Sequence, residues 1–485
     1  MSIQAPRIQV PSVQAPSVQA PSIQARGRTP AGLGDVVVPG DDGYEEARRT
    51  VFATGSPALV TRPRDEAEVA AAVAYAAREG LPLSVRSGGH GLTGRATNDG
   101  GLVVDLRHLD AVEVVDAHHR LVRVGAGATW GRVAAALAPH GLAISSGDTA
   151  SVGVGGLTLG GGVGWMVRRH GLTVDALVGA RVVLADGRTV VASRDSHAGL
   201  FWALRGGGGG FGVVTGVDLV AAWVGDVRYG AIGLALDDPA RLVAGWRDVL
   251  READEELSST LVLAPPVGDR PSSASVLVCA SHDDAAAAER AVEPLRRLGT
   301  VLSDTVATVP YADVLAEGGH HPPGLRLVGR NVLVPRLDDD VVAAVAAASA
   351  GDRPVALALR ALGGAFSRVL PDATAFAHRD AEALVVGGTV VPQDASDADV
   401  EDALAGWRGV AAHGTGAYVN FQGTDTAADL HAAYPPATLA RLRAVKRSYD
   451  PGGLFGRHLD GAPAGAPAGA PAGAPAGAPG SGAAS

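Results

Sequence analysis

The stretch Leu81-Pro82-Leu83-Ser84-Val85-Arg86-Ser87-Gly88-Gly89-His90-Gly91 joins an apolar run to a glycine turn that contains a histidine. The apolar run predicts a strand, and the glycines predict a turn whose successive backbone N–H groups face one side. Such a concave row of donors binds phosphate oxygens. A lone loop histidine is more often structural than functional, so the rest of the chain decides what His90 does.

Glycines gather in two further clusters, residues 147–164 and residues 206–212. Each cluster offers the same kind of phosphate-binding turn as the first. Three such turns in one half of the chain suit an extended ligand that carries a pyrophosphate.

A nicotinamide dinucleotide fingerprint competes with this interpretation, because Gly207, Gly209 and Gly212 fit the G-x-G-x-x-G pattern. That fingerprint requires a strand before it and a helix after it. Here a helical pattern at residues 196–205 precedes the glycines and a strand-like run at residues 213–217 follows them. The order is reversed, and we do not expect a Rossmann site.

Several stretches, in the same order along the chain, resemble the flavin-linked oxidases of the berberine bridge enzyme-like type, within the vanillyl-alcohol oxidase superfamily. The matching segments are residues 86–91, 151–164, 200–210, 418–421 (Tyr-Val-Asn-Phe) and 449–451 (Tyr-Asp-Pro). The resemblance implies an α+β fold. It consists of a two-subdomain FAD-binding domain of the PCMH type and a substrate domain with an antiparallel sheet covered by helices.

The resemblance also implies how FAD is held. In the family, the histidine of the first glycine loop is bonded through a ring nitrogen to the 8α-methyl group of the flavin, a role that falls on His90. Many members add a bond from a cysteine, but this chain has Thr149 there, and a hydroxyl is a poor substitute for a thiolate. We therefore expect a single covalent link. The other expected FAD contacts are Arg86, Ser87, Gly88, Gly89, Gly91, Gly147, Thr149, Ser151, Gly153, Gly155, Gly156, Gly162, Gly164, Gly210, Gly212, Val213, Val214, Asn420 and Phe421.

Tyr418 and Asn420 are the expected catalytic residues. The resemblance assigns the tyrosine of this motif as the base or as a substrate partner, and strand alternation would point Tyr418 and Asn420 to the same side. The alternative for Tyr418 is a half-buried tyrosine hydrogen-bonded within a sheet. Thr374-Ala375-Phe376-Ala377-His378-Arg379 also resembles a family stretch, and we interpret it as structural.

Local patterns predict several elements between the low-complexity ends of the chain, residues 1–30 and 461–485. Helical periodicity marks residues 64–80, 130–138, 238 onward, 283–298, 338–350 and 394–411, and the last four begin with an aspartate suited to capping. Asp186-Gly187 between two apolar runs predicts a hairpin. In the second half, strand candidates such as residues 276–280, 355–359 and 383–386 predict a sheet of about four to six strands with helices on one face.

Length and composition suggest two or three domains in the 485 residues. We expect an FAD-binding domain at residues 31–223, a substrate domain at 224–430, and a return to the FAD domain at 431–460, where Gly453 replaces the family's usual asparagine. Low-complexity repeats fill residues 1–30 and 461–485. They predict disordered or extended tails, with polyproline docking as the less favoured alternative.

Several function classes are disfavoured. The net charge of −10 and the lack of a basic run argue against nucleic acid as a partner. No membrane span or signal peptide is apparent, so we expect a cytoplasmic location, although secretion stays open. Cys279 is alone, which excludes an internal disulfide, and the pairs His118-His119 and His320-His321 lack the spacing of metal sites, so we expect no metal.

The sequence thus predicts an FAD-dependent oxidase that dehydrogenates a C–OH or C–N bond of a small molecule, such as a sugar or a secondary metabolite, and passes the electrons to O2. Two alternatives stay open: a dehydrogenase of the same fold with another electron acceptor, and a non-catalytic flavin-binding protein. A monomer and a homodimer are both compatible with the sequence.

Overall fold

The computed structural model describes most of the chain between its two tails. The described residues are 32–266, 271–317, 325–351, 353–392, 394–456 and 458–460. The predicted tails, residues 1–30 and 461–485, and the pair His320-His321 lie outside the described residues.

The first sheet of the amino-terminal half has four strands in the order β1-β2-β4-β3, with β2 and β3 parallel to β4. Its strands are β1 (Asp35–Val37), β2 (Leu59–Arg62), β3 (Leu83–Arg86) and β4 (Leu102–Asp105). Helix α2 (Glu66–Glu79) begins where the Asp65 side chain accepts a hydrogen bond from the Glu68 N–H, and it ends at Gly80 in the left-handed conformation. The glycine turn that contains His90 follows strand β3, as predicted.

The second sheet is antiparallel, in the order β5-β6-β10-β8-β9. Its strands are β5 (Val112–Asp116), β6 (Leu121–Gly125), β8 (Leu177–Val183), β9 (Thr189–Ser193) and β10 (Val213–Val220). The predicted hairpin is confirmed, because β8 and β9 pair around a turn in which Gly187 has a φ of 80°.

Short helices fill the space beside these two sheets. They are α1 (Tyr44–Ala47), α3 (Trp130–Leu137), α4 (Val154–Gly160), α5 (Val167–His170) and α6 (Ala198–Leu204). Helix α6 precedes the third glycine cluster and strand β10 follows it, which is the reverse of the Rossmann order. One apolar core unites both sheets.

The third sheet is fully antiparallel and has eight strands, in the order β15-β12-β14-β13-β18-β19-β17, with β16 also paired to β12. The strands are β12 (Asp226–Ala235), β13 (Leu257–Ala264), β14 (Ser273–Ala280), β15 (Val301–Asp304), β16 (Ala307–Pro310), β17 (Leu325–Val334), β18 (Ala356–Ala361) and β19 (Ala383–Pro392). The prediction of about four to six strands was too low. Short, exposed strands such as β15 lack the buried apolar run that the sequence criterion required.

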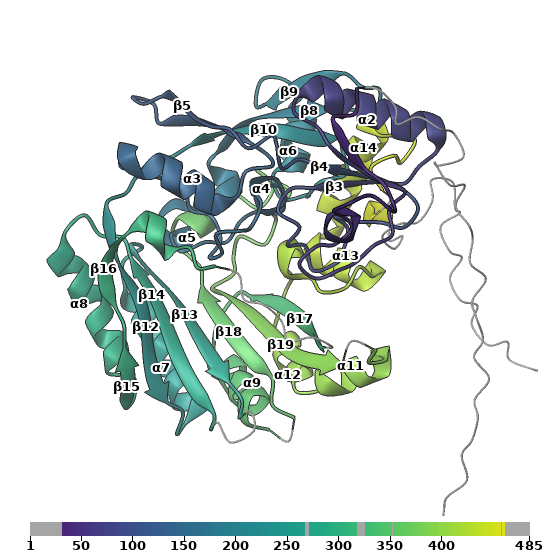
Figure 1. Cartoon of the computed structure of the whole chain (residues 1–485). Helices are drawn as coiled ribbons and strands as arrows, with labels where there is room; N and C mark the ends of the chain where they lie inside the picture. Colours follow the sequence, from purple (N-terminus) through teal and green to yellow (C-terminus); the bar gives the residue numbers. More distant parts are fainter. Residues whose placement is uncertain are drawn as a thin grey trace, which may run out of the picture.

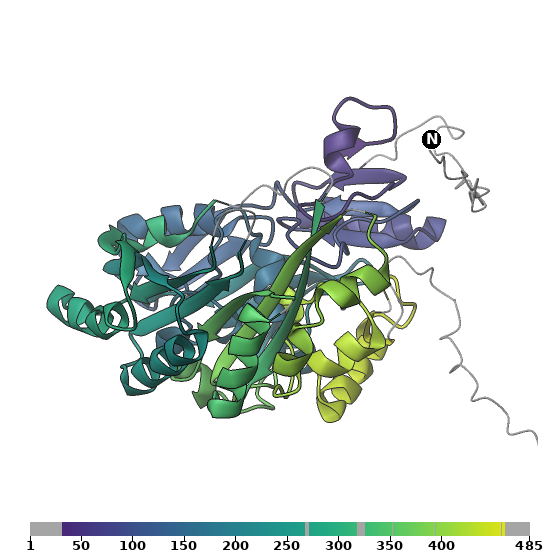
Figure 2. The ribbon, with the colours of Figure 1, turned by 90° about the horizontal axis from the view of Figure 1, so that it is seen from below.

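Helices cover one face of this sheet, and the other face lies toward the first two sheets (Figures 1 and 2). The long helices are α7 (Pro239–Glu252), α8 (Ala285–Arg296) and α9 (Asp339–Ala350). Their amino-terminal caps are Asp238 and Asp338, as predicted, and Asp284, one residue after the aspartate that the sequence indicated.

The fourth helix predicted for this face, residues 394–411, is wrong in two respects. The segment forms two helices, α11 (Asp397–Ala403) and α12 (Trp407–Ala411), separated near Gly406. Its cap is Ser396, whose side chain accepts the Asp399 N–H while the Asp399 carboxylate binds the Ser396 N–H. This reciprocal capping box, rather than an aspartate at position 394, sets the start of α11.

The chain then returns to the first core through α13 (Ala427–Ala433) and α14 (Pro436–Tyr449), drawn in yellow-green and yellow in Figure 1. Leu430, Tyr434, Leu439 and Leu442 are buried in that core. The remaining elements are short: β7 (Leu142–Ala143), β11 (Ala222–Trp223) and α10 (Ala365–Arg368), with 3-10 turns that include Val419–Phe421. Within the described residues, no helix combines the length and apolar character needed to cross a bilayer.

Candidate active site

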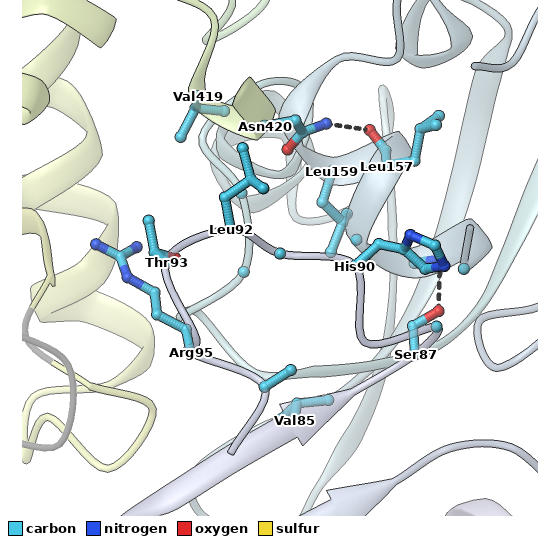
Figure 3. A pocket seen from close by; sticks show the side chains of 18 of the residues that line it. Val85, Ser87, His90, Leu92, Thr93, Arg95, Leu157, Leu159, Val419 and Asn420 are labelled. Atoms are coloured by element: carbon cyan, nitrogen blue, oxygen red, sulfur yellow. Dashed lines mark hydrogen bonds between the residues drawn. The ribbon is translucent and has the colours of Figure 1, made fainter. Parts of the chain in front are cut away.

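A cavity of about 390 Å³ lies between the three glycine clusters and the segment around Tyr418. Figure 3 shows His90 and Asn420 reaching toward it from separate chain segments, with the Asn420 amide bonded to the Leu157 carbonyl at 3.0 Å. The cavity therefore brings together the two parts of the sequence that the resemblance singled out.

Two of the glycine loops touch main chain to main chain. A Cβ placed on Gly88 would lie 2.3 Å from the Gly153 nitrogen, and one on Gly153 would lie 2.1 Å from the Gly88 nitrogen. Ser87 Oγ donates to the Ala126 carbonyl at 2.6 Å and accepts the Gly155 N–H at 3.3 Å. Glycine at both positions allows the loops to form one continuous wall.

His90 is half-buried in this wall. Its Nε2 lies 3.0 Å from Ser151 Oγ, so the second glycine loop orients the imidazole. Burial lowers the pKa of His90, which keeps the ring neutral near pH 7. A neutral imidazole presents a nitrogen lone pair, which a protonated ring does not.

The residues that line the cavity fit a phosphate-bearing cofactor. Gly91, Gly156 and Gly209 line it, and a Cβ added to any of them would meet no protein atom within 4 Å. Their φ values lie outside the left-handed region, so neither packing nor backbone strain requires glycine there. A ligand that approaches the backbone closely would require glycine at these positions. The exposed N–H groups suit phosphate oxygens.

Tyr418 and Asn420 are brought together, although the geometry predicted for them was wrong. Val419–Phe421 form a 3-10 turn instead of a strand. The Tyr418 main chain binds the Asn331 side chain on β17, with bonds of 2.6 Å and 3.1 Å, in place of a neighbouring strand. The turn still joins the two side chains, because the Asn420 amide donates to the Tyr418 hydroxyl at 2.8 Å.

The Tyr418 hydroxyl accepts further hydrogen bonds from the backbone, at 2.9 Å from the Gly162 N–H and 3.4 Å from the Val163 N–H. Burial raises the pKa of Tyr418, while these donors and the charge of Arg360 act in the opposite direction. Donors aimed at an oxygen stabilise its anion. The arrangement therefore favours the phenolate more than burial alone would allow.

Arg360 on β18 crosses from the third sheet to the second glycine loop. It donates to the Asp148 carboxylate at 2.5 Å, and its guanidinium carbon lies 5.1 Å from the centre of the Phe421 ring. The positive charge of Arg360 holds the pKa of Asp148 below its ordinary value. Both side chains are therefore charged where the two halves of the molecule meet.

Most of the predicted FAD contacts line the cavity, but six do not. Those that line it are Ser87, Gly88, Gly89, His90, Gly91, Gly147, Gly153, Gly155, Gly156, Gly210, Gly212, Val214, Asn420 and Phe421, together with Tyr418. Those that do not are Arg86, Thr149, Ser151, Gly162, Gly164 and Val213.

Several of these six residues do not line the cavity themselves but are hydrogen-bonded to residues that do, or to neighbouring main chain. Ser151 binds His90, and Gly162 binds Tyr418. Arg86 is buried and donates to the Ala47 and Ala96 carbonyls. The Thr149 hydroxyl donates to the Asp148 carboxylate at 3.0 Å.

Other lining residues were not predicted from the sequence. Arg95 and Asp425 form an ion pair at the cavity although 330 residues separate them, with an Nε to Oδ2 distance of 2.8 Å. Phe455 also lines the cavity, and its N–H donates to buried Asp450, which is paired with Lys446 at 2.5 Å. Asp450 belongs to the recognised Tyr-Asp-Pro motif, so that motif was an indirect signal for Phe455.

Arg379, from the stretch that we interpreted as structural, is buried and binds both Asp175 carboxylate oxygens, at 2.7 Å and 2.8 Å. His378 Nε2 lies 3.1 Å from the Ala433 carbonyl oxygen. The Arg379 contact joins the segment after β18 to the first half of the chain, and the His378 contact joins it to α13.

One group of side chains in the described residues could hold a metal ion: Asp254, Glu256 and His282, whose ligand atoms lie within 4.8 Å of one another. It shares no residue with the cavity. Exposed acidic groups of this kind are common without an ion, and we assign no metal to it.

Comparison with known proteins agrees with this geometry. Residues 57–193 match the family model of an FAD binding domain. The chain is 33% identical over 458 residues to (R)-6-hydroxynicotine oxidase of Paenarthrobacter nicotinovorans, covering 89% of this chain and 97% of that protein. The fold and the site thus define an FAD-linked oxidoreductase.

Solved structures extend the likeness over both halves of the chain. The crystal structure of 6-hydroxy-D-nicotine oxidase from Arthrobacter nicotinovorans superposes with a TM-score of 0.78 at 30% identity, covering 88% of this chain and 96% of that one. Glucooligosaccharide oxidase from Acremonium strictum, whose structure is described with a 6-S-cysteinyl, 8α-N1-histidyl FAD, gives 0.74 at 25% identity, covering 89% and 98%. This chain belongs to the FAD-linked oxidases of the vanillyl-alcohol oxidase superfamily, in the berberine bridge enzyme-like group.

Proposed function

We propose that the protein is an oxidase that holds FAD through a single covalent bond, from His90 to the 8α-methyl group. His90 lies in the wall of the glycine-lined cavity, and Ser151 occupies its Nε2, which leaves Nδ1 as the attachment atom. Its neutral ring supplies the lone pair that the attachment needs.

The absence of a thiol beside the cavity supports a single link. The related glucooligosaccharide oxidase is described with a second, cysteinyl bond. Here Thr149 replaces the expected cysteine, and its hydroxyl is bonded to Asp148. Cys279 is buried in β14, where burial raises the pKa of its thiol to about 12.

For the reaction, we assign Tyr418 as the general base. Bound FAD would accept a hydride from the substrate carbon, while a proton leaves the neighbouring oxygen or nitrogen. The Tyr418 hydroxyl lies in the same cavity as His90 and accepts three hydrogen bonds, which stabilise the phenolate that would take that proton. Asn420 holds the phenol in place and ties it to the Leu157 carbonyl. This placement of Tyr418 is the observation on which the proposal rests.

The proposed substrate is a small molecule with a CH–OH or CH–N group, such as a sugar, a cyclic amine or a secondary metabolite, and the proposed acceptor is O2, reduced to H2O2. A full-length relative is named for hydroxynicotine, and another relative of the same fold for glucooligosaccharides. The cavity wall contains aromatic and amide side chains next to Tyr418, which suit either a ring or a polyol.

The experiment has two parts. Acid precipitation of the holoprotein should leave the yellow chromophore on the polypeptide, and precipitation of His90→Ala should release it. Anaerobic addition of alcohols, oligosaccharides and cyclic amines should then identify a substrate that bleaches the flavin, followed by H2O2 release when air is admitted.

A matched pair of variants tests the base. Tyr418→Phe should retain its flavin spectrum while flavin reduction slows about 10²- to 10⁴-fold, the usual loss for a general base. Tyr75→Phe, a change at a tyrosine on α2 that does not line the cavity, should reduce at the wild-type rate. Complete release of flavin from the wild-type chain by acid, or reduction of Tyr418→Phe at the wild-type rate, would contradict the proposal.

A further inference from the structure

The charged groups around Tyr418 are few. Arg360 approaches from β18 and stacks on Phe421, whose ring centre is 5.1 Å from that of Tyr418. Arg379 lies over the Phe376 ring at 5.1 Å, and that ring is 6.0 Å from the Tyr418 ring. The glycine turn at residues 160–164 and Asn331 on β17 contribute no charge.

These charges are not equivalent. Arg379 is compensated by two hydrogen bonds to the Asp175 carboxylate, and burial lowers the pKa of nearby His378, which leaves that ring neutral. Arg360 has a single bond to Asp148, and its Nε–H is buried without a hydrogen-bond partner among the described residues. Arg360 lies over the Phe421 ring, which packs against Tyr418, and its charge lowers the pKa of Tyr418, although less than the hydrogen bonds from Gly162, Asn420 and Val163 do.

The ion pair fixes the position of this charge. Asp148 comes from the second glycine loop and Arg360 from the third sheet, 212 residues later in the chain. Asp148 is also bonded to Thr149, and the loop main chain is held by the Ala150 N–H to Ala316 carbonyl bond of 2.8 Å and the Ala316 N–H to Asp148 carbonyl bond of 2.9 Å. The main chain on both sides of Asp148 is therefore held in place. The Asp148 carboxylate in turn fixes the Arg360 guanidinium beside Phe421.

We infer that Arg360 is a positioning residue for the oxidation chemistry: anchored by Asp148, it keeps a positive charge beside Tyr418 and stabilises the phenolate that removes the substrate proton. The inference rests on the proposed role of Tyr418 as the base. The cation comes from the substrate domain and is held by the FAD domain. The positive charge therefore lies beside Tyr418 only when the two domains are in contact. A cation near an acid favours its ionised form, and the effect decreases with distance.

The test is the pH dependence of flavin reduction in the intact holoenzyme, measured anaerobically by stopped flow with pH jumps from about pH 7 to about pH 11. The substrate is whichever compound bleaches the flavin in the screen described above. Arg360→Gln should move the apparent pKa of the reduction rate upward by about one unit. Below that pKa, the rate should fall about tenfold. Arg360→Lys, which keeps the charge, should restore most of the wild-type profile.

The matched control is Arg330→Gln. Arg330 lies on β17 of the same sheet but is paired with Glu401 of α11 at 3.0 Å, on the helix-covered face. Its loss removes one positive charge from the same domain and should leave the pH profile unchanged. If Arg360→Gln fails to retain flavin, Arg360→Met keeps the aliphatic stem over Phe421 and replaces it in the test.

The outcomes separate this inference from the proposed function. If Tyr418→Phe loses activity while Arg360→Gln reduces flavin at the wild-type rate at every pH, or if Arg360→Lys is as slow as Arg360→Gln, Tyr418 remains the base and the role inferred for Arg360 is wrong. If Arg330→Gln shifts the profile as much as Arg360→Gln does, the effect is a general charge effect and the inference is again wrong. If Tyr418→Phe reduces at the wild-type rate, the proposed function itself fails.

Discussion

Gly88→Ala tests whether the contact between the two glycine loops shapes the cofactor site. The added Cβ would lie 2.3 Å from the Gly153 nitrogen, 2.8 Å from its Cα and 2.9 Å from the Ser151 carbonyl oxygen, all of them main-chain atoms. Real Cβ atoms essentially never approach closer than 3.0 Å, so the loops must separate by about 0.7 Å, the difference between 3.0 Å and 2.3 Å. Overpacking of this kind costs about 1–3 kcal/mol.

The same separation should disturb the histidine. The His90–Ser151 bond is 3.0 Å long, and an extension of about 0.7 Å takes it beyond hydrogen-bonding distance. We therefore expect Gly88→Ala to unfold at a lower temperature and to contain less acid-stable flavin per mole of protein. Thermal unfolding and the flavin absorbance of acid-precipitated protein measure the two effects.

Gly156→Ala is the matched control for stability. Gly156 is helical, and an added Cβ meets no protein atom within 4 Å, so the apoprotein should be as stable as wild type or more stable by about 0.5–1 kcal/mol. Wild-type unfolding temperature together with full flavin content in Gly88→Ala would refute the account of the loops as main-chain contacts.

Three further predictions concern stability and reactivity. Arg379→Met should lower the free energy of unfolding by about 3–5 kcal/mol in urea titrations, because it leaves Asp175 partly buried without its cation, whereas Arg188→Met, at an exposed pair, should cost under about 1 kcal/mol. Burial and the charges of Arg169 and Arg120 lower the pKa of His170 to about 4, so between about pH 6.5 and about pH 4 the unfolded chain binds a proton that the folded chain does not. Stability should therefore fall as the pH is lowered through that window, by about 1 kcal/mol per unit, and a His170→Asn variant with an unchanged slope would contradict this. Cys279 should not react with a thiol reagent until the protein is unfolded in urea, because its thiol is fully buried, and rapid labelling of the native protein would show that β14 is more accessible than described.

Features whose chemistry is local were predictable from the sequence. Asp65, Asp238 and Asp338 cap their helices with their own side chains, and Asp186-Gly187 sets its hairpin by turn geometry alone. These signals lie within a few residues of the element that they define. Distant parts of the fold do not alter them.

Features that depend on distant contacts were not predictable in the same way. The alternation in Tyr418-Val419-Asn420-Phe421 suits a strand, but the Tyr418 main chain is held by Asn331, and a turn results. No motif marks Arg360 or Asp148, because their pairing arises only when the third sheet meets the second glycine loop.

The two halves of the active-site wall have separate origins along the chain. The loops suited to the cofactor come from residues before 215, whereas Tyr418, Asn420 and Phe421 come from the later part. Such a partition allows substitutions at the later lining residues beside Tyr418 to change what is oxidised while the cofactor-binding loops are inherited intact. It offers a physical reason why proteins of this architecture are named for compounds as unlike as an alkaloid and an oligosaccharide, and it marks the later lining residues Val419, Gln422 and Leu430 as the place to begin any redesign of substrate choice.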